Sequence, residues 1–224
     1  AERHEEIVAT LAKKNKGLTR DEISKDSKIP TGGNLTTLLE ELEESGFIRR
    51  YIPFGKQSRN SLYQLCDFFT LFHIKFIKGQ KTFDENYWLK MIDSPKHRAW
   101  SGYAFEQVCL AHVPQIKKAL GINGVETETS SWKSNQAKDG AQIDLVIDRR
   151  DEVINVFEMK FSISPFIIDK KYDAELRNKV GAFKAETRTK KSVFLTMLTT
   201  YGLQNNSYAG NVQNDIKMDI LFVE

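Results

Sequence analysis

AQIDLVIDRRDEVINVFEMKFS, residues 141–162, decides the fold of the second half of the chain. Two apolar runs, 142–148 and 153–162, flank the charged stretch 149–152, which is the pattern of two strands joined by a tight turn. Residues two apart on a strand project from the same face, so Glu158 and Lys160 are expected to point the same way. Asp144 interrupts the first run in the same manner, and charges inside such strands need a reason.

These side chains predict a metal site on one face of the hairpin. Asp144 and Glu158 are expected on neighbouring strands, and carboxylates that close repel unless a cation lies between them. Mg²⁺ or Mn²⁺ suits such hard oxygen ligands, and Lys160 is suited to orient a water or to stabilise charge on a phosphate. Glu106, near the apolar stripe of an expected helix, is a third candidate ligand. The alternative is a solvated sheet face with a weak cross-strand ion pair.

Patterns on both sides of the hairpin indicate an α/β layer arrangement. A helix is expected over 97–120, with Pro114 able to kink or split it, followed by a weakly alternating run at 124–130. After the hairpin we expect a helix over 169–188 and strands at 191–198 and 216–224. The fold class is therefore α/β (α+β), with helices flanking the sheet.

The first part of the chain has the order of a winged helix-turn-helix. A helix is expected over 3–14, a capping box of Thr19 and Glu22 begins a second, and a third ends at Gly46. Two short strand-like runs around the polar turn 55–60 complete the order. We expect three regions: a winged helix-turn-helix at 1–66, an aromatic-rich helical linker packing between domains at 67–97, and an α/β domain at 98–224.

A winged helix normally presents its third helix to the major groove of DNA and its wing to phosphates. Thr31 and Asn34 are the candidate polar contacts at the start of that helix, and the candidate basic contacts of the wing are Arg49, Arg50, Lys56 and Arg59. The helix ends in the acidic residues Glu40, Glu41, Glu43 and Glu44, which a DNA backbone would repel. DNA binding and a role in protein contacts or as a spacer both remain open.

Composition excludes several classes of protein. The chain of 224 residues is 28% charged with a net charge of +3, so any nucleic-acid binding must come from local basic patches. Two cysteines without a CxxC spacing indicate a cytoplasmic protein without a disulfide framework. No apolar run is long enough to cross a membrane, and no GxxxxGK[ST] phosphate loop for ATP is present.

The second half resembles the PD-(D/E)xK nuclease superfamily. The matching order is a helix with Glu106, a strand with Asp144, a strand with Glu158 and Lys160, and a further helix, with Ile143 where the family usually has proline. The resemblance implies a restriction-endonuclease-like mixed sheet flanked by helices. It also implies that the three acids hold Mg²⁺ and that the lysine assists phosphodiester hydrolysis. Lys179 and Lys184 are candidates for the basic residue that later helices of this family often add.

The whole chain is similar to the C-terminal half of bacterial and archaeal AAA-type P-loop ATPases. The segments that carry this likeness are GLTRDEISKDSKIPTGGNLTTLLEELEESGFIRR, LYQLCDFFTLFHIKFI, GYAFEQVCLAHVPQIKKALGI, IDLVIDR and VFEMKFS. The likeness implies an ATPase domain in cis, with ATP bound only on that domain, and the opening Ala1 fits a fragment of a longer protein. We expect a Mg²⁺-dependent module that cuts DNA. The alternatives are a catalytically silent DNA- or protein-docking module and a transcriptional regulator.

Overall fold

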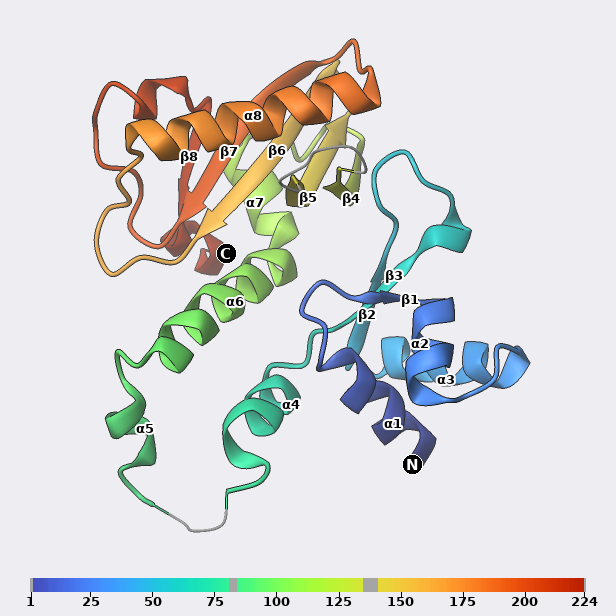
Figure 1. Cartoon of the computed structure of the whole chain (residues 1–224). Coiled ribbons are helices and arrows are strands. Elements are labelled where there is room, and N and C mark those ends of the chain that lie inside the picture. Colours follow the sequence, from blue (N-terminus) through green and yellow to red (C-terminus); the bar gives the residue numbers. More distant parts are fainter. Residues whose placement is uncertain (1, 81–83, 135–140, 224) are drawn as a thin grey trace. The chain divides into compact units, whose positions relative to one another are not determined.

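The chain forms two compact units, residues 1–97 and 98–224 (Figure 1). The computed structural model describes residues 2–80, 84–134 and 141–223. The boundary between the units falls at His97 and Arg98, where the sequence places the start of the α/β domain. The aromatic segment 67–97 belongs to the first unit.

The first unit begins with the arrangement of a winged helix. Its helices are α1 (Glu2–Leu11), α2 (Arg20–Ser27) and α3 (Gly33–Glu44), and its strands are β1 (Leu18–Thr19), β2 (Ile48–Tyr51) and β3 (Leu62–Leu65). The strands form an antiparallel sheet in the order β1-β3-β2. The two-residue strand β1 was not expected, because two residues carry no detectable alternation. The wing between β2 and β3 includes a 3₁₀ turn, Ser58–Asn60.

Local capping explains where these helices begin and end. Thr19 caps α2 by accepting a hydrogen bond from the backbone N–H of Glu22, whose side chain accepts one from the Thr19 backbone in return. This confirms the predicted capping box. Gly46 follows the end of α3 with φ of 76°, a left-handed conformation that glycine adopts without steric cost. The start of α2 and the end of α3 therefore both follow from local residues, the first through hydrogen bonds and the second through the backbone freedom of glycine.

Replacing Thr19 with alanine should destabilise α2 by about 1 kcal/mol, because the backbone N–H of Glu22 loses its acceptor. Hydrogen exchange of the α2 amides measures this directly. Thr37→Ala is the matched control, since the Thr37 hydroxyl donates to the Gly33 carbonyl within α3 and caps nothing. Equal exchange of α2 in both variants would contradict the capping assignment.

Aromatic side chains hold the rest of the first unit together. The segment comprises α4 (Phe68–Phe72), a π-helical turn (His73–Ile77) and α5 (Tyr87–Met91). Phe72, Phe76 and Trp88 form a mutual cluster with ring centroids 5.1–5.3 Å apart. The Lys96 ammonium lies 4.7 Å from the centroid of the Phe76 ring. The interpretation of the aromatic stretch as core holds for Phe76, which is buried, but not for Phe68 and Phe69, which are exposed.

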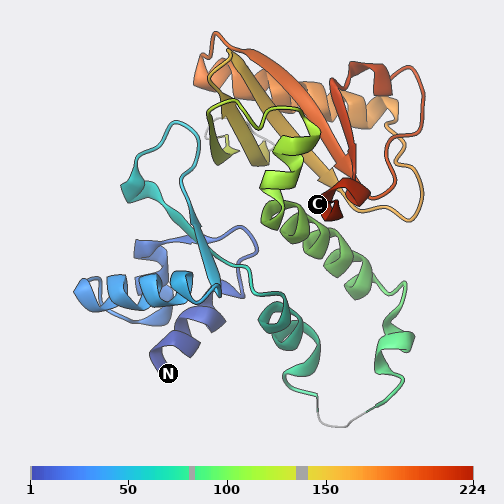
Figure 2. The same ribbon diagram turned by 180° about the vertical axis from the view of Figure 1, so that it is seen from behind.

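A five-stranded mixed sheet forms the centre of the second unit (Figures 1 and 2). The strands lie in chain order: β4 (Thr127–Lys133), β5 (Gln142–Arg149), β6 (Val153–Lys160), β7 (Ser192–Thr199) and β8 (Asn214–Lys217). The pairs β4–β5 and β5–β6 are antiparallel, whereas β6–β7 and β7–β8 are parallel. Parallel neighbours need a crossover, and α8 (Lys170–Thr187) supplies it between β6 and β7.

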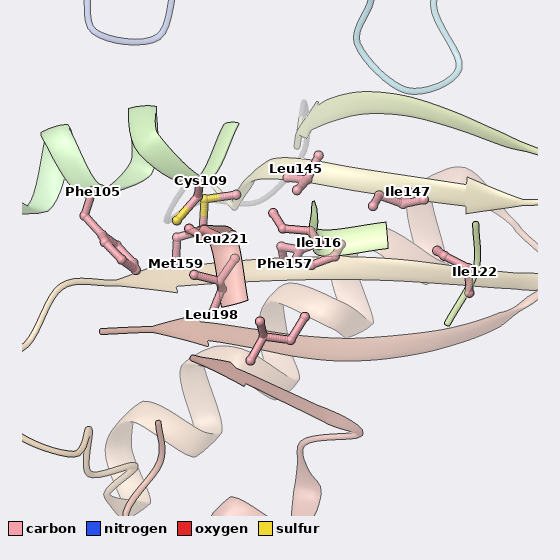
Figure 3. Packing of buried hydrophobic residues seen from close by; sticks show 11 residues of the cluster. Phe105, Cys109, Ile116, Ile122, Leu145, Ile147, Phe157, Met159, Leu198 and Leu221 are labelled. Atoms are coloured by element: carbon pink, nitrogen blue, oxygen red, sulfur yellow. The ribbon is translucent and has the colours of Figure 1, made fainter. Parts of the chain in front are cut away.

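Helices cover both faces of this sheet. On one face, α6 (Pro95–Ala111) and α7 (Val113–Ala119) enclose the main hydrophobic core, which Figure 3 shows. The split between them follows the expected effect of Pro114, which lies in the first turn of α7. The core residues on β5 and β6 are Leu145, Ile147, Phe157 and Met159. Their alternation leaves the side chains of Asp144, Glu158 and Lys160 on the other face, which α8 covers.

The expected strand at 216–224 is wrong in extent. The strand β8 ends at Lys217, and Met218–Phe222 form a 3₁₀ turn. This turn places Leu221 in the core beside α6 and α7, so burial of a leucine at the end of the sheet outweighs the strand-like pattern. Cys66 and Cys109 are free thiols. None of the described helices has the length and apolar character that a membrane span requires.

Candidate functional site

Glu158 is the centre of the candidate site. It lies near the end of β6 and is only 8% exposed, on the face of the sheet that α8 covers. Strand alternation directs Glu158 toward α8, because Phe157 and Met159 on either side are anchored in the opposite core. A buried carboxylate of this kind requires charge partners.

Three side chains surround the Glu158 carboxylate. The Tyr172 hydroxyl donates to Oε1 over 2.7 Å, and the Lys160 ammonium lies 3.1 Å from the same oxygen. The Lys179 ammonium donates to Oε2. Lys160 also lies 5.6 Å from the centroid of the Tyr172 ring. Both carboxylate oxygens therefore have partners. Residues of β6 and α8 contact Oε1, and a residue of α8 contacts Oε2.

Burial and charge act in opposite directions on this cluster. Burial by itself would raise the pKa of Glu158, but the ammonium groups of Lys179 and Lys160 and the hydrogen bonds from Lys179 and Tyr172 hold it below its ordinary value of 4.5. Burial and the neighbouring Glu158 charge raise the pKa of Tyr172 well above its ordinary value. Glu158 is thus ionised and Tyr172 is a neutral hydrogen-bond donor at neutral pH.

Asp144 lies on the neighbouring strand and the same face. The paired residues of β5 and β6 run from Asp148–Ile154 to Val146–Val156, and Asp144 lies two residues beyond the last pair, on the same face as Val146. Asp144 is half-buried, and its Oδ1 accepts a hydrogen bond from the side-chain amide of Gln142 over 2.6 Å. Strand periodicity therefore puts Asp144 and Glu158 on one face of neighbouring strands, and their pairing around a common cation stays a prediction.

Glu106 comes from the other side of the sheet. It lies on α6, between the buried residues Phe105 and Gln107, and α6 covers the face opposite to α8. Within residues 2–80, 84–134 and 141–223, no three His, Cys, Asp or Glu side chains are grouped to hold a metal ion. The structure thus brings Asp144, Glu158 and Lys160 to one face and does not add Glu106 to them as a third ligand.

Sequence reasoning missed Tyr172 and gave Lys179 little weight. The two residues are seven apart on α8, which puts them on the same face of the helix, and that spacing was a usable signal. Lys184, the other basic candidate, lines a separate cavity of about 320 Å³ between α8, β7 and residues 208–213. In that cavity the buried Asp173 accepts hydrogen bonds from Arg177 and Asn211.

The candidate DNA contacts of the first unit are exposed at the start of α3 and on the wing. Thr31 precedes α3 and Asn34 lies in its first turn, and both are solvent-accessible. Lys56 and Arg59 are exposed on the wing. Arg20 of α2 holds the start of α3 through the Gly32 carbonyl and the Thr36 hydroxyl.

Arg49 and Arg50 do not form a single basic patch. They are consecutive on β2, so their side chains project to opposite faces of the small sheet. Arg49 donates to Gln64, whereas Arg50 donates to Ser61 and lies over the Tyr63 ring. Only one of the two arginines can share a face with the basic residues of the wing tip. The predicted cluster is therefore divided between two faces.

Comparison with known proteins gives little further information. No family model matches the sequence, and no curated protein matches it. Among solved structures, the chain is similar to the crystal structure of a protein of unknown function, AF1548, at 17% sequence identity and a TM-score of 0.36. The match covers 51% of this chain and 64% of that protein, which is less than two thirds of its length. A likeness of this size identifies neither a family nor an activity.

Proposed function

We propose that the second unit is a divalent-cation-dependent nuclease that hydrolyses phosphodiester bonds in DNA. The observation that carries this proposal is the shared face of Asp144, Glu158 and Lys160 on the neighbouring strands β5 and β6. The order of the elements, a helix, three antiparallel strands, a crossover helix and a parallel strand, also supports it. This is the arrangement that the resemblance to the PD-(D/E)xK superfamily implies.

The donor set fits Mg²⁺ or Mn²⁺ in its chemistry. Magnesium in proteins is often held by one or two carboxylates, with waters and substrate phosphates completing its coordination. Asp144 and Glu158 are such a pair, so a third protein ligand is not required. When bound between these residues, the ion would polarise a phosphate oxygen and acidify a water.

The residues of the chain have distinct roles in this proposal. Asp144 and Glu158 carry two negative charges, and Lys160 and Lys179 carry two positive ones. The summed charge of the four side chains is therefore zero before a cation and an anionic phosphodiester are added. Lys160, with its side chain 37% exposed, is free to turn from Glu158 toward a phosphate oxygen. Tyr172 keeps its proton and fixes the orientation of the Glu158 carboxylate.

A second candidate is a silent module with the same fold that docks DNA or protein. The observation that favours it is that both oxygens of Glu158 are already engaged by Lys160, Lys179 and Tyr172. A cation must compete with the Lys179 ammonium for the same carboxylate. In this alternative the ion pairs stabilise the packing of α8 on the sheet and no hydrolysis takes place.

For the first unit we propose duplex DNA binding through the start of α3 and the wing, which would bring the nuclease to DNA. The exposed Thr31, Asn34, Lys56 and Arg59 support this role. The full-length protein would place an ATPase domain in cis, as the resemblance of the whole chain implies, and would act in the cytoplasm.

Cleavage of supercoiled plasmid and single-stranded circular DNA in Mg²⁺, Mn²⁺ or EDTA tests the proposal. If the second unit is a nuclease, cleavage products form in Mg²⁺ or Mn²⁺ and none form in EDTA. Intact DNA under all conditions, from a protein with a cooperative unfolding transition, would support the silent module.

A further inference from the structure

The parallel strands of the second unit end at one edge of the sheet. The loops that follow β6 and β7 are hydrogen-bonded to one another there. These loops, residues 161–169 after β6 and 200–206 after β7, lie beside one another in both views (Figures 1 and 2). The Thr200 hydroxyl accepts from the Ser162 backbone, and Phe166 exchanges backbone hydrogen bonds with Gly202 and Gln204. The Asn206 amide donates to the Ile168 carbonyl. The edge is therefore a built surface that positions its side chains.

Large apolar side chains are exposed on these two loops. Their exposed fractions are 84% for Ile163, 57% for Ile167, 54% for Tyr201 and 41% for Phe161. The neighbouring residues Ile168 and Gly202 are buried, so the loops are packed beneath while these side chains face solvent. Exposed apolar side chains that are gathered on one surface mark an interaction site, whereas single scattered ones do not.

The same edge carries positive charge. Lys160, at the end of β6, is followed in register by Thr199 on β7 and Lys217 on β8. The stem of Lys217 lies against Gly202, next to Tyr201. Lys170 and Lys171 are exposed at the start of α8, directly after the first loop.

Acidic side chains lie at the same edge and do not outnumber the lysines. Asp169 accepts the backbone N–H of Tyr172 at the start of α8, and Asp215 accepts that of Leu203, and both keep their negative charge. Glu158 is shared by Lys160 and Lys179. The edge therefore presents apolar side chains among lysines and acids, beside the Asp144–Glu158 site.

We propose that this edge binds a single-stranded segment of nucleic acid and leads it to the Asp144–Glu158 site. Lysines contact the phosphates, while Tyr201 and Ile163 pack against unstacked bases. The exposed base faces of a single strand cover the apolar side chains of the edge. A continuous duplex hides those base faces in its stack, so it leaves the apolar side chains without a partner. The proposal rests on the nuclease function, for which it names the form of the substrate.

Fluorescence anisotropy with the full chain tests this surface without requiring catalysis. The probes are a labelled oligothymidylate and a duplex of the same length, both in EDTA, so that no cleavage takes place. Tyr201→Ala should weaken binding of oligothymidylate by about tenfold and leave duplex binding unchanged. The matched control is Phe222→Ala, which removes an aromatic side chain that is 62% exposed on the C-terminal turn.

Equal effects of Tyr201→Ala and Phe222→Ala on oligothymidylate binding would overturn the inference. A preference for anionic vesicles or for a second copy of the chain, with no Tyr201-dependent binding of oligothymidylate, would also overturn it. Tyr201-dependent binding without any cleavage in Mg²⁺ or Mn²⁺ would support the surface and refute the nuclease function. Cleavage of DNA with no effect of Tyr201→Ala on binding would support the nuclease and refute the surface.

Discussion

Replacing Lys160 with alanine is expected to lower the rate of Mg²⁺-dependent DNA cleavage by about 100-fold or more. In the proposed mechanism its ammonium group stabilises the charge that builds on the phosphate in the transition state, and loss of one such donor typically costs about 10²–10³ in rate. The fold should be little affected, because Glu158 keeps its hydrogen bonds from Lys179 and Tyr172. The measurement is kcat for cleavage of a labelled substrate under saturating Mg²⁺.

Lys118→Ala is the matched control for this experiment. Lys118 is an exposed lysine on α7, the helix that packs on the opposite face of the sheet from α8. Its removal should change kcat by less than about twofold, because its ammonium group is not part of the proposed site. A Lys160→Ala protein that cleaves as fast as Lys118→Ala would contradict the assigned role of Lys160.

Replacing Glu158 with alanine should lower the free energy of unfolding of the second unit by about 3 kcal/mol. The change leaves the ammonium groups of Lys160 and Lys179 without their carboxylate in a largely buried site, and such unpaired charges cost several kcal/mol. The expected loss is at the lower end of that range because both lysine side chains are partly exposed. Urea unfolding followed by tryptophan fluorescence measures it, with Glu175→Ala as a surface control expected to change stability by less than about 1 kcal/mol.

The pH dependence of the free energy of unfolding gives an independent check on the charge of Glu158. The pKa of Glu158 is lowered in the folded state, so its ionised form stabilises the fold above the unfolded pKa, and this contribution is lost as the pH falls toward the folded pKa. The stability difference between wild type and Glu158→Gln should therefore be constant near neutral pH and shrink below its ordinary pKa of 4.5. A difference that grows on acidification would contradict the assigned direction.

Local patterns in the sequence predicted much of the fold. The Thr19 capping box, the glycine stop at Gly46 and the break at Pro114 depend on neighbouring residues alone, and all three are confirmed. The C-terminal turn was missed because its cause is not local. Leu221 enters a core made by α6 and α7, and the segment 216–224 contains no signal for that packing.

The candidate site was predictable where it depends on strand periodicity. The shared face of Glu158 and Lys160 follows from a period of two, and the same period puts Asp144 of β5 on that face, since Leu145 and Ile147 lie in the opposite core. The contacts of Tyr172 and Lys179 depend on how α8 crosses the sheet, which periodicity does not specify. The position of Glu106 depends in the same way on which face α6 covers, and that face was not encoded in the helical pattern.

Mn²⁺ binding to the full chain, followed by the electron paramagnetic resonance signal of the free ion, tests most directly whether Asp144 and Glu158 share a divalent cation. A shared site should be lost in both Asp144→Asn and Glu158→Gln and retained in Glu175→Gln. Mn²⁺ binding that is absent from the wild type, or that persists unchanged in Asp144→Asn and Glu158→Gln, would contradict it.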